Sequence, residues 1–208
     1  MDNKKRDIST ENRIIEAARQ VFTKKGYAAT RTDDIAKEAG INRALLHYYF
    51  RSKDKMFEII FTDRLKEFFS GIVSILLSEK TVVEKIRALV MHDITTLQEH
   101  PDMPLFVISE ITNNKDRFIE FVNQAGIPKG KLIEMLQNQI DREIEEGKLK
   151  PTTSAQQLMM NTMSMAIYPF LARPIIQTMM MMDDRKFNSM IEKRKKEVAD
   201  FIINSIKA

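Results

Sequence analysis

Four residues, Arg43, Ala44, His47 and Tyr48, recur at a spacing that places them on one side of a short helix. An arginine side chain can form two hydrogen bonds with the edge of a guanine, and a histidine can donate to a phosphate. Arg43 would stand at the leading end of the helix, where base edges are reached when a helix enters the major groove. These residue types at this spacing predict a surface that reads double-stranded DNA.

Two short helices joined by a tight turn must position this surface. Thr32 can cap the first helix, whose opening turn is acidic, and Gly40 would end it. After the turn at 40–42, Asn42 can cap the second helix. Such a pair of helices is a helix-turn-helix, whose second helix can enter the DNA major groove.

The inward face of the second helix is predicted from Leu45, Leu46 and Tyr49, although the Tyr49 hydroxyl could still reach the DNA backbone. Two simpler interpretations remain open at this point. Arg43 could be a solvated cation at a helix start, and His47 could be an exposed polar residue. The position of Arg43 next to the turn favours base recognition.

The charge of the chain is concentrated near its N-terminus. Residues 1–55 contain 13 Lys and Arg against 8 Asp and Glu, whereas residues 56–208 contain 20 against 21. A basic segment on a nearly neutral body is expected when only one end of a protein meets phosphate. Residues 1–8 are polar and predicted to be mobile, with Lys4, Lys5 and Arg6 either lying along DNA or forming a solvated tail.

The rest of the chain shows helical periodicity without a strand pattern or an internal repeat, which predicts an all-α fold of about nine helices. A first helix ending at Gly26 would complete a three-helix unit, and Ser52 can cap a long fourth helix. Thr81 and Glu84 form a capping box, and Asp183 can cap the last helix. The further helices are expected at about 103–112, 115–125 and 131–146, and after Thr153 or Ser154 with a bend or break at Pro169 and Pro174.

Two domains are predicted, a helix-turn-helix DNA-binding domain at 1–53 and a ligand-binding and dimerisation body at 54–208. The apolar run from Leu158 to Met182 contains polar residues and two prolines, so we interpret it as a buried helix of a soluble protein that does not enter a membrane. The chain has no cysteine and no signal-peptide pattern. A cytoplasmic location is therefore expected.

Polar and methionine side chains in the body are candidates to bind a small molecule. His92 and Tyr168 lie on apolar helices, where a polar group needs a partner, and Met159 and Met163 could line an adaptable apolar pocket. Met179–Met182 are expected to pack in a dimer interface. No catalytic motif, cofactor site or compact set of metal ligands is found, so an enzyme is not predicted.

The N-terminal quarter of the chain resembles the TetR/AcrR family of bacterial regulators. The pattern is T-x-x-I-A-x-x-A-G followed by L-x-x-Y-F-x-S-K at the start of a long helix. The matching residues are Thr32, Ile35, Ala36, Ala39, Gly40, Leu46, Tyr49, Phe50, Ser52 and Lys53.

This resemblance implies a homodimer formed by the last two helices, with an effector cavity in each body coupled to the DNA-binding heads through the fourth helix. Thr32 and Lys53 would meet phosphate, and Arg43, Ala44 and Tyr48 would face bases. We therefore expect a ligand-responsive repressor of a pseudo-palindromic operator, released by a small apolar or aromatic effector. The alternatives are an all-α binding or protein-interaction module without sequence-specific DNA binding, and a regulator without a small-molecule effector.

Overall fold

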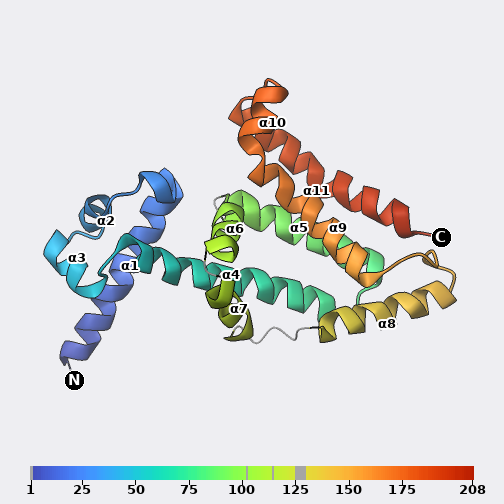
Figure 1. Cartoon of the computed structure of the whole chain (residues 1–208), viewed down its shortest axis with the longest axis horizontal. Helices are drawn as coiled ribbons and strands as arrows, with labels where there is room; N and C mark the ends of the chain where they lie inside the picture. Colours follow the sequence, from blue (N-terminus) through green and yellow to red (C-terminus); the bar gives the residue numbers. More distant parts are fainter. Residues whose placement is uncertain (1, 102, 114, 125–129) are drawn as a thin grey trace. The chain divides into compact units, whose positions relative to one another are not determined.

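The regular structure of the chain is helical, as a computed structural model shows for residues 2–101, 103–113, 115–124 and 130–208 (Figure 1). Within these residues the only strand-like pairing is an isolated bridge between Leu149 and Lys207. The chain forms two compact units, Met1–Lys66 and Glu67–Ala208. The helices are α1 (Asp2–Ala29), α2 (Thr32–Glu38), α3 (Arg43–Tyr49), α4 (Lys53–Leu77), α5 (Val82–Glu99), α6 (Met103–Asn113), α7 (Lys115–Gln124), α8 (Lys131–Glu145), α9 (Ala155–Leu171), α10 (Arg173–Met179) and α11 (Asp184–Ile206).

The all-α prediction is therefore confirmed. The described residues form more helices than the expected nine, in part because the run after Ser154 is divided into α9 and the short helix α10. The unit Met1–Lys66 contains α1, α2, α3 and the first half of α4. Its core is apolar, as the helical spacing predicted. The fully buried side chains include Ile14, Ile35, Leu46 and Met56.

The first helix differs from its predicted limits at the N-terminal end. It begins at Asp2, so the segment expected to be a mobile tail is helical, and the side chains of Lys4, Lys5 and Arg6 lie outside the described residues. Gly26 interrupts the helix, with φ of 74° and ψ of 164°. Because side chains disfavour this positive φ, glycine is suited to the position predicted as the helix end.

An aromatic cluster fixes the end of α1 against the start of α4. The Phe57 ring lies 5.0 Å from the Phe22 ring and 4.5 Å from the Tyr27 ring. The Tyr27 hydroxyl donates a hydrogen bond to Asp54. Burial, and then this contact with Asp54, raises the pKa of Tyr27 to about 12.

In the unit Glu67–Ala208, α5, α9 and α11 pack side by side, and α8 packs against α5 and α9 (Figure 1). The predicted helix starts are confirmed: Ser52 accepts from the Lys55 N–H, Thr81 and Glu84 form a capping box, and Asp183 accepts from the Lys186 N–H at 2.7 Å. The hydrogen bond from Thr81 lowers the pKa of Glu84. These caps satisfy backbone N–H groups that have no partner within their own helices.

The apolar run from Leu158 to Met182 is only partly buried, which corrects the interpretation of the whole run as buried. It is divided at Ala172 into α9, which contains Pro169, and α10, in which no residue is buried. A proline cannot donate to the preceding turn, so the prolines favour the predicted break. None of the helices in the described part of the chain has the length and apolarity that a membrane span requires.

Candidate nucleic-acid interface and ligand site

The turn between α2 and α3 is closed by backbone hydrogen bonds that require a glycine. Gly40 has φ of 63°, its N–H donates to the Lys37 carbonyl at 3.1 Å, and the Ile41 N–H donates to the Ala36 carbonyl at 3.0 Å. This pair of bonds is a Schellman motif, which ends α2. Asn42 then accepts from the Leu45 N–H at 2.8 Å and starts α3. The turn predicted from the sequence is therefore present, with both helix ends defined.

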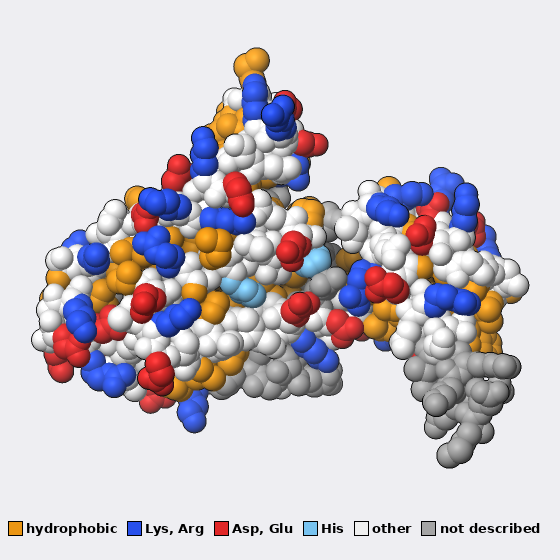
Figure 2. Space-filling view, turned by 180° about the vertical axis from the view of Figure 1, so that it is seen from behind, with side chains coloured by type: hydrophobic (Ala, Val, Ile, Leu, Met, Phe, Trp, Pro, Cys, Tyr) orange, Lys and Arg blue, Asp and Glu red, His pale blue; other side chains and the backbone are white. Residues whose placement is uncertain are grey.

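The outward face of α3 presents the four residues that were predicted to read DNA. Arg43, Ala44, His47 and Tyr48 are all exposed, and Tyr48 retains 76% of its accessible surface. Leu46, at 2% exposure, anchors the opposite side of the helix. Figure 2 shows Lys and Arg side chains on the visible face of this N-terminal unit. The four side chains are free to meet a large ligand together.

The inward face of α3 is narrower than predicted. Leu45 is 37% exposed and Tyr49 is half-buried, so the expectation that Leu45 points inward is wrong. A helix of seven residues makes only two turns, so few of its side chains can face the core. In α3 only Leu46 is buried. The Tyr49 ring lies edge-on to the Tyr48 ring, with their centroids 5.3 Å apart. Leu45 therefore borders the exposed face of α3.

Arg43 forms an ion pair across the turn. Its Nε lies 3.5 Å from Oδ1 of Asp33 in α2, and both side chains are largely exposed. An exposed ion pair is weak because water screens it and both side chains lose conformational freedom. Arg43 is therefore loosely held and can exchange Asp33 for another partner.

Thr32 does not cap α2, which corrects the sequence prediction by one residue. The N-cap is Arg31, and its backbone N–H donates to Asp34 at 3.1 Å. A hydrogen bond from Lys25, and then the one from Arg31, lowers the pKa of Asp34. Thr32 is the first residue of α2 and is half-exposed, so its hydroxyl remains near the helix start.

Lys53 is engaged within its own unit. Its ammonium group donates to the carbonyl oxygens of Tyr27 at 2.9 Å and Thr30 at 3.1 Å, and lies 4.2 Å from the centre of the Tyr27 ring. These carbonyls close the C-terminal end of α1, where the helix dipole favours a cation. The structure thus gives Lys53 a role in the fold, beside the phosphate contact predicted for it.

His92, the first of the four predicted effector residues, contacts α4. Its Nε2 lies 3.0 Å from the carbonyl oxygen of Phe68, and its ring stacks on the Phe68 ring at 5.4 Å. Gly71 makes this approach possible, because a Cβ there would lie 2.3 Å from the His92 ring. The histidine therefore joins α5 to α4 in the described structure.

The structure does not bring the other three predicted effector residues together. Met159 is buried and Met163 half-buried on one side of α9. Tyr168 is 61% exposed and lies about two and a half turns further along α9, on the side of the helix opposite to Met159. The prediction that Tyr168 sits within an apolar surface and needs a partner there is not supported, whereas Met159 faces the interior.

Asp93 is a candidate that the sequence-based prediction missed. It is 1% exposed, its Oδ1 has no hydrogen-bond partner among the described residues, and burial raises its pKa to about 7. Its position gave a signal, because Leu89, Asp93 and Leu97 share the four-residue spacing of one helix face. An acidic residue in such a row is exceptional and points to a special role.

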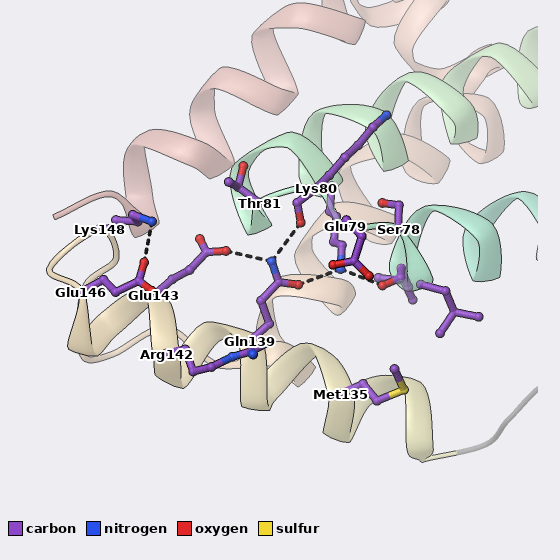
Figure 3. A pocket seen from close by; sticks show the side chains of 13 residues that line it. Ser78, Glu79, Lys80, Thr81, Met135, Gln139, Arg142, Glu143, Glu146 and Lys148 are labelled. Carbon is purple, nitrogen blue, oxygen red and sulfur yellow. Dashed lines mark hydrogen bonds and ion pairs between the residues drawn. The ribbon is translucent and has the colours of Figure 1, made fainter.

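A cavity of about 340 Å³ lies between α8 and the turn that joins α4 to α5 (Figure 3). Lys85 lines it and donates to the Leu76 carbonyl at 2.8 Å and to Gln139 at 2.7 Å. Gln139 donates in turn to Glu143 and to the Lys80 carbonyl, and Glu143 accepts from the Val82 N–H at 3.0 Å. These groups satisfy one another, so the network holds the turn against α8.

None of the four predicted effector residues lines this cavity. Where side chains are described, no three His, Cys, Asp or Glu residues are close enough to hold a metal ion. The described structure thus has an exposed helix-turn-helix surface and, in the other unit, a buried carboxyl group whose Oδ1 has no hydrogen-bond partner among the described residues.

Two family models match the chain. The model described as "Bacterial regulatory proteins, tetR family" matches residues 14–60, and the model described as "Tetracyclin repressor-like, C-terminal domain" matches residues 83–202. The first match contains α2, α3 and their turn. The second covers more than half of the chain and most of its second unit.

Individual relatives agree with these matches. The probable HTH-type transcriptional regulator YttP of Bacillus subtilis is 26% identical over 147 residues, which cover 68% of this chain and 66% of YttP, slightly less than two thirds. In fold, the chain resembles the ketosteroid transcriptional regulator KstR2 of Mycobacterium tuberculosis, with a TM-score of 0.63, 19% identity and 95% of each chain covered.

The chain also resembles in fold the transcriptional regulator FadR of Bacillus subtilis, solved in complex with stearoyl-CoA, with a TM-score of 0.55, 15% identity and 92% and 96% of the two chains covered. These matches are to regulators and not to enzymes. They do not support the alternative of a binding module without DNA recognition. The chain belongs to the TetR family of transcriptional regulators, with an N-terminal helix-turn-helix DNA-binding domain.

Proposed function

We propose that this regulator is a homodimeric, ligand-responsive repressor that binds a pseudo-palindromic operator through α3. The observation that carries the proposal is the shared exposure of Arg43, Ala44, His47 and Tyr48 on a helix anchored by Leu46. A recognition helix presents side chains of this kind to base edges from its N-terminal part. The functional boundary at residue 53 remains a prediction.

The proposed roles follow from where each side chain lies. Arg43 would pair with a guanine, and Ala44 and Tyr48 would contact neighbouring bases. His47 and Thr32 would contact phosphates, and so would the hydroxyl group of Tyr49, a residue that is half-buried. Lys53 would act mainly by holding the end of α1, and its remaining N–H could reach a phosphate.

The proposed dimer forms through the last two long helices, α9 and α11. Phe201 of α11 is 63% exposed, and Met160 and Tyr168 of α9 are 60% and 61% exposed. Exposed large apolar side chains on neighbouring helices are typical of a protein interface. The exposed Met179–Met181 segment at the C-terminal end of α10 would extend this interface. A two-fold dimer presents two copies of α3 to half-sites about 34–36 Å apart, or a multiple of that.

The proposed effector is a small molecule with a large apolar part that binds in the unit Glu67–Ala208. The buried Met159 and half-buried Met163 support an adaptable apolar site, and no cofactor is invoked. The stearoyl-CoA in FadR is consistent with such a ligand, although it concerns that protein alone. By linkage, operator binding and effector binding must weaken each other by the same factor, typically about 5–150-fold.

The proposal is tested with DNA from upstream of the protein's own coding region. A gel shift at a stated salt concentration should show a complex of one protein dimer with a short segment of this DNA. A scrambled duplex of the same length should bind at least about a thousandfold more weakly. Equal affinity for the two duplexes, or binding by a monomer, would contradict the proposed operator recognition.

A further inference from the structure

Asp93 lies in the buried face of α5, the helix that packs against α8, α9 and α11. Its side chain is 99% buried, and Oδ1 has no hydrogen-bond partner among the described residues. A buried polar atom without a partner destabilises a fold by about 1–3 kcal/mol. Proteins seldom retain such a group unless another function requires it.

The neighbouring helices do not supply the missing partner. Residues 155–171 of α9 contain no Asp, Glu, Lys, Arg or His. On α11, Asp200 pairs with Arg87 of α5 at 2.9 Å, and Lys195 pairs with Glu192 at 2.7 Å. These charged groups therefore leave Asp93 uncompensated.

Most of the remaining charged groups near α5 have other contacts. Arg194 of α11 donates from Nη2 to the Met165 carbonyl at 3.0 Å, and its Nε is buried without a hydrogen-bond partner among the described residues, but no ion pair joins Arg194 to Asp93 in the described structure. On the α8 side, Lys85 and Glu143 are held by Gln139. His92, the adjacent residue, is directed to the Phe68 carbonyl. None of these groups donates a hydrogen bond to Oδ1 of Asp93.

We propose that Asp93 is the polar anchor of the effector site and recognises a protonated amine on an otherwise apolar molecule. This inference rests on the proposed function, in which the body binds an effector. An ammonium group supplies a positive charge and N–H donors, which together offset the burial of a carboxylate. A ligand carboxylate could not form this ion pair and would add a second buried acid, and an alcohol could provide only a neutral hydrogen bond.

The apolar part of the ligand is expected to lie against α9. Its Met159 is buried and its Met163 half-buried on the side that turns toward the core. Methionine has three rotatable bonds and a polarizable sulfur, so these side chains can rearrange around a ligand. The apolar part of an amine ligand would therefore replace contacts that these side chains make with one another. Its ammonium group would add one ion pair with Asp93.

The test uses three probes with the same eight-carbon chain, namely octylamine, octanol and octanoate. Calorimetry on the full-length protein at pH 6.5 should show that octylamine binds about tenfold or more tightly than octanol, and that octanoate binds most weakly. Asp93→Asn should reduce octylamine binding to the level of octanol and leave octanol binding unchanged. Glu99→Gln, at an exposed carboxylate of the same helix, is the matched control and should behave as wild type.

Two further readouts separate recognition from a structural role. Binding of octylamine should release a proton from Asp93, which is measured by repeating the titration in buffers of different ionisation enthalpy. The release should disappear in Asp93→Asn. Above pH 7, Asp93→Asn and Asp93→Leu should both unfold at a higher temperature than wild type, because each removes a buried negative charge that has no partner.

Three results would overturn the inference: equal binding of octylamine and octanol, a preference for the amine that survives in Asp93→Asn, or a lower unfolding temperature in both variants. Binding of all three probes without preference would remove the role of Asp93 and leave the effector site in place. Failure to bind operator DNA would count against the proposed repressor function itself.

Discussion

Nε of Arg43 lies 3.5 Å from Oδ1 of Asp33, so the residue proposed to read a base is held by a carboxylate of the preceding helix in the absence of DNA. Arg43→Ala should weaken operator binding by about 5–150-fold, since a bidentate contact to guanine contributes about 1–3 kcal/mol. Non-specific DNA should lose much less. Fluorescence anisotropy with operator and scrambled duplexes measures both affinities.

Asp33→Asn should change binding in the opposite direction. It removes a competing partner of Arg43 and a negative charge near phosphate, and the gain should not exceed about fivefold, because an exposed ion pair contributes little. Lys131→Ala, at an exposed cation of α8, is the control that should leave both affinities unchanged. If Arg43→Ala weakened binding to the operator and to the scrambled duplex equally, Arg43 would not take part in base recognition.

Lys53→Met should destabilise the DNA-binding unit, because it leaves the carbonyl groups of Tyr27 and Thr30 without their charged donor. Hydrogen bonds to charged groups contribute about 1.5–3 kcal/mol. Urea unfolding should show the loss, and Lys55→Met, at an exposed lysine, should not. If Lys53 instead served only as a phosphate contact, the stability would stay unchanged. The slope of the logarithm of DNA affinity against the logarithm of salt concentration would then become smaller by about one unit.

The stability of the protein should depend on pH through Asp93. Burial raises its pKa from 3.8 to about 7, so between these values the folded state binds a proton that the unfolded state has released. The contribution of Asp93 to the free energy of unfolding is therefore highest below about pH 4. It falls by at most about 4 kcal/mol as the pH rises to 7. Asp93→Asn should flatten that part of the profile in urea unfolding from pH 5 to 8. A wild-type profile that rises over this range and is unaltered by the substitution would contradict the assignment.

Glu143→Ala should lower the unfolding temperature, because it leaves the Val82 N–H without an acceptor and the Gln139 amide with only the Lys80 carbonyl. An unsatisfied buried donor costs about 1–3 kcal/mol, and each kcal/mol corresponds to about 2–4 °C in a chain of this size. Glu146→Ala removes a carboxylate that contacts Lys148 at the surface and serves as the control. An equal, small effect of the two substitutions would show that the network does not hold the turn.

Phe201→Glu should yield a monomer in analytical ultracentrifugation, since it places a charge on the 63% exposed side chain of α11 that is proposed to enter the dimer interface. Operator binding should fall with the loss of the dimer, while circular dichroism should still report a helical protein. Phe201→Leu keeps the apolar contact and should remain dimeric. A dimeric Phe201→Glu variant would place the interface elsewhere.

The sequence by itself determined the helix boundaries that depend on local chemistry. Gly40 specifies the end of α2 because its backbone adopts a positive φ, and Asn42, Thr81 and Asp183 cap helices with side chains that reach only three residues ahead. The outward face of α3 was also predictable, because helical spacing alone places Arg43 beside His47. The TetR resemblance rested on the same local pattern.

Only the tertiary structure decided which side chains are buried and what they contact. Leu45 has the periodicity of a core residue and Tyr168 lies on an apolar helix, but both are exposed, because burial depends on which helix packs against that side. Lys53 finds carbonyl groups more than twenty residues away in the chain, and Asp93 is enclosed without a partner. Such contacts join residues distant in sequence, so spacing along one helix carries no information about them.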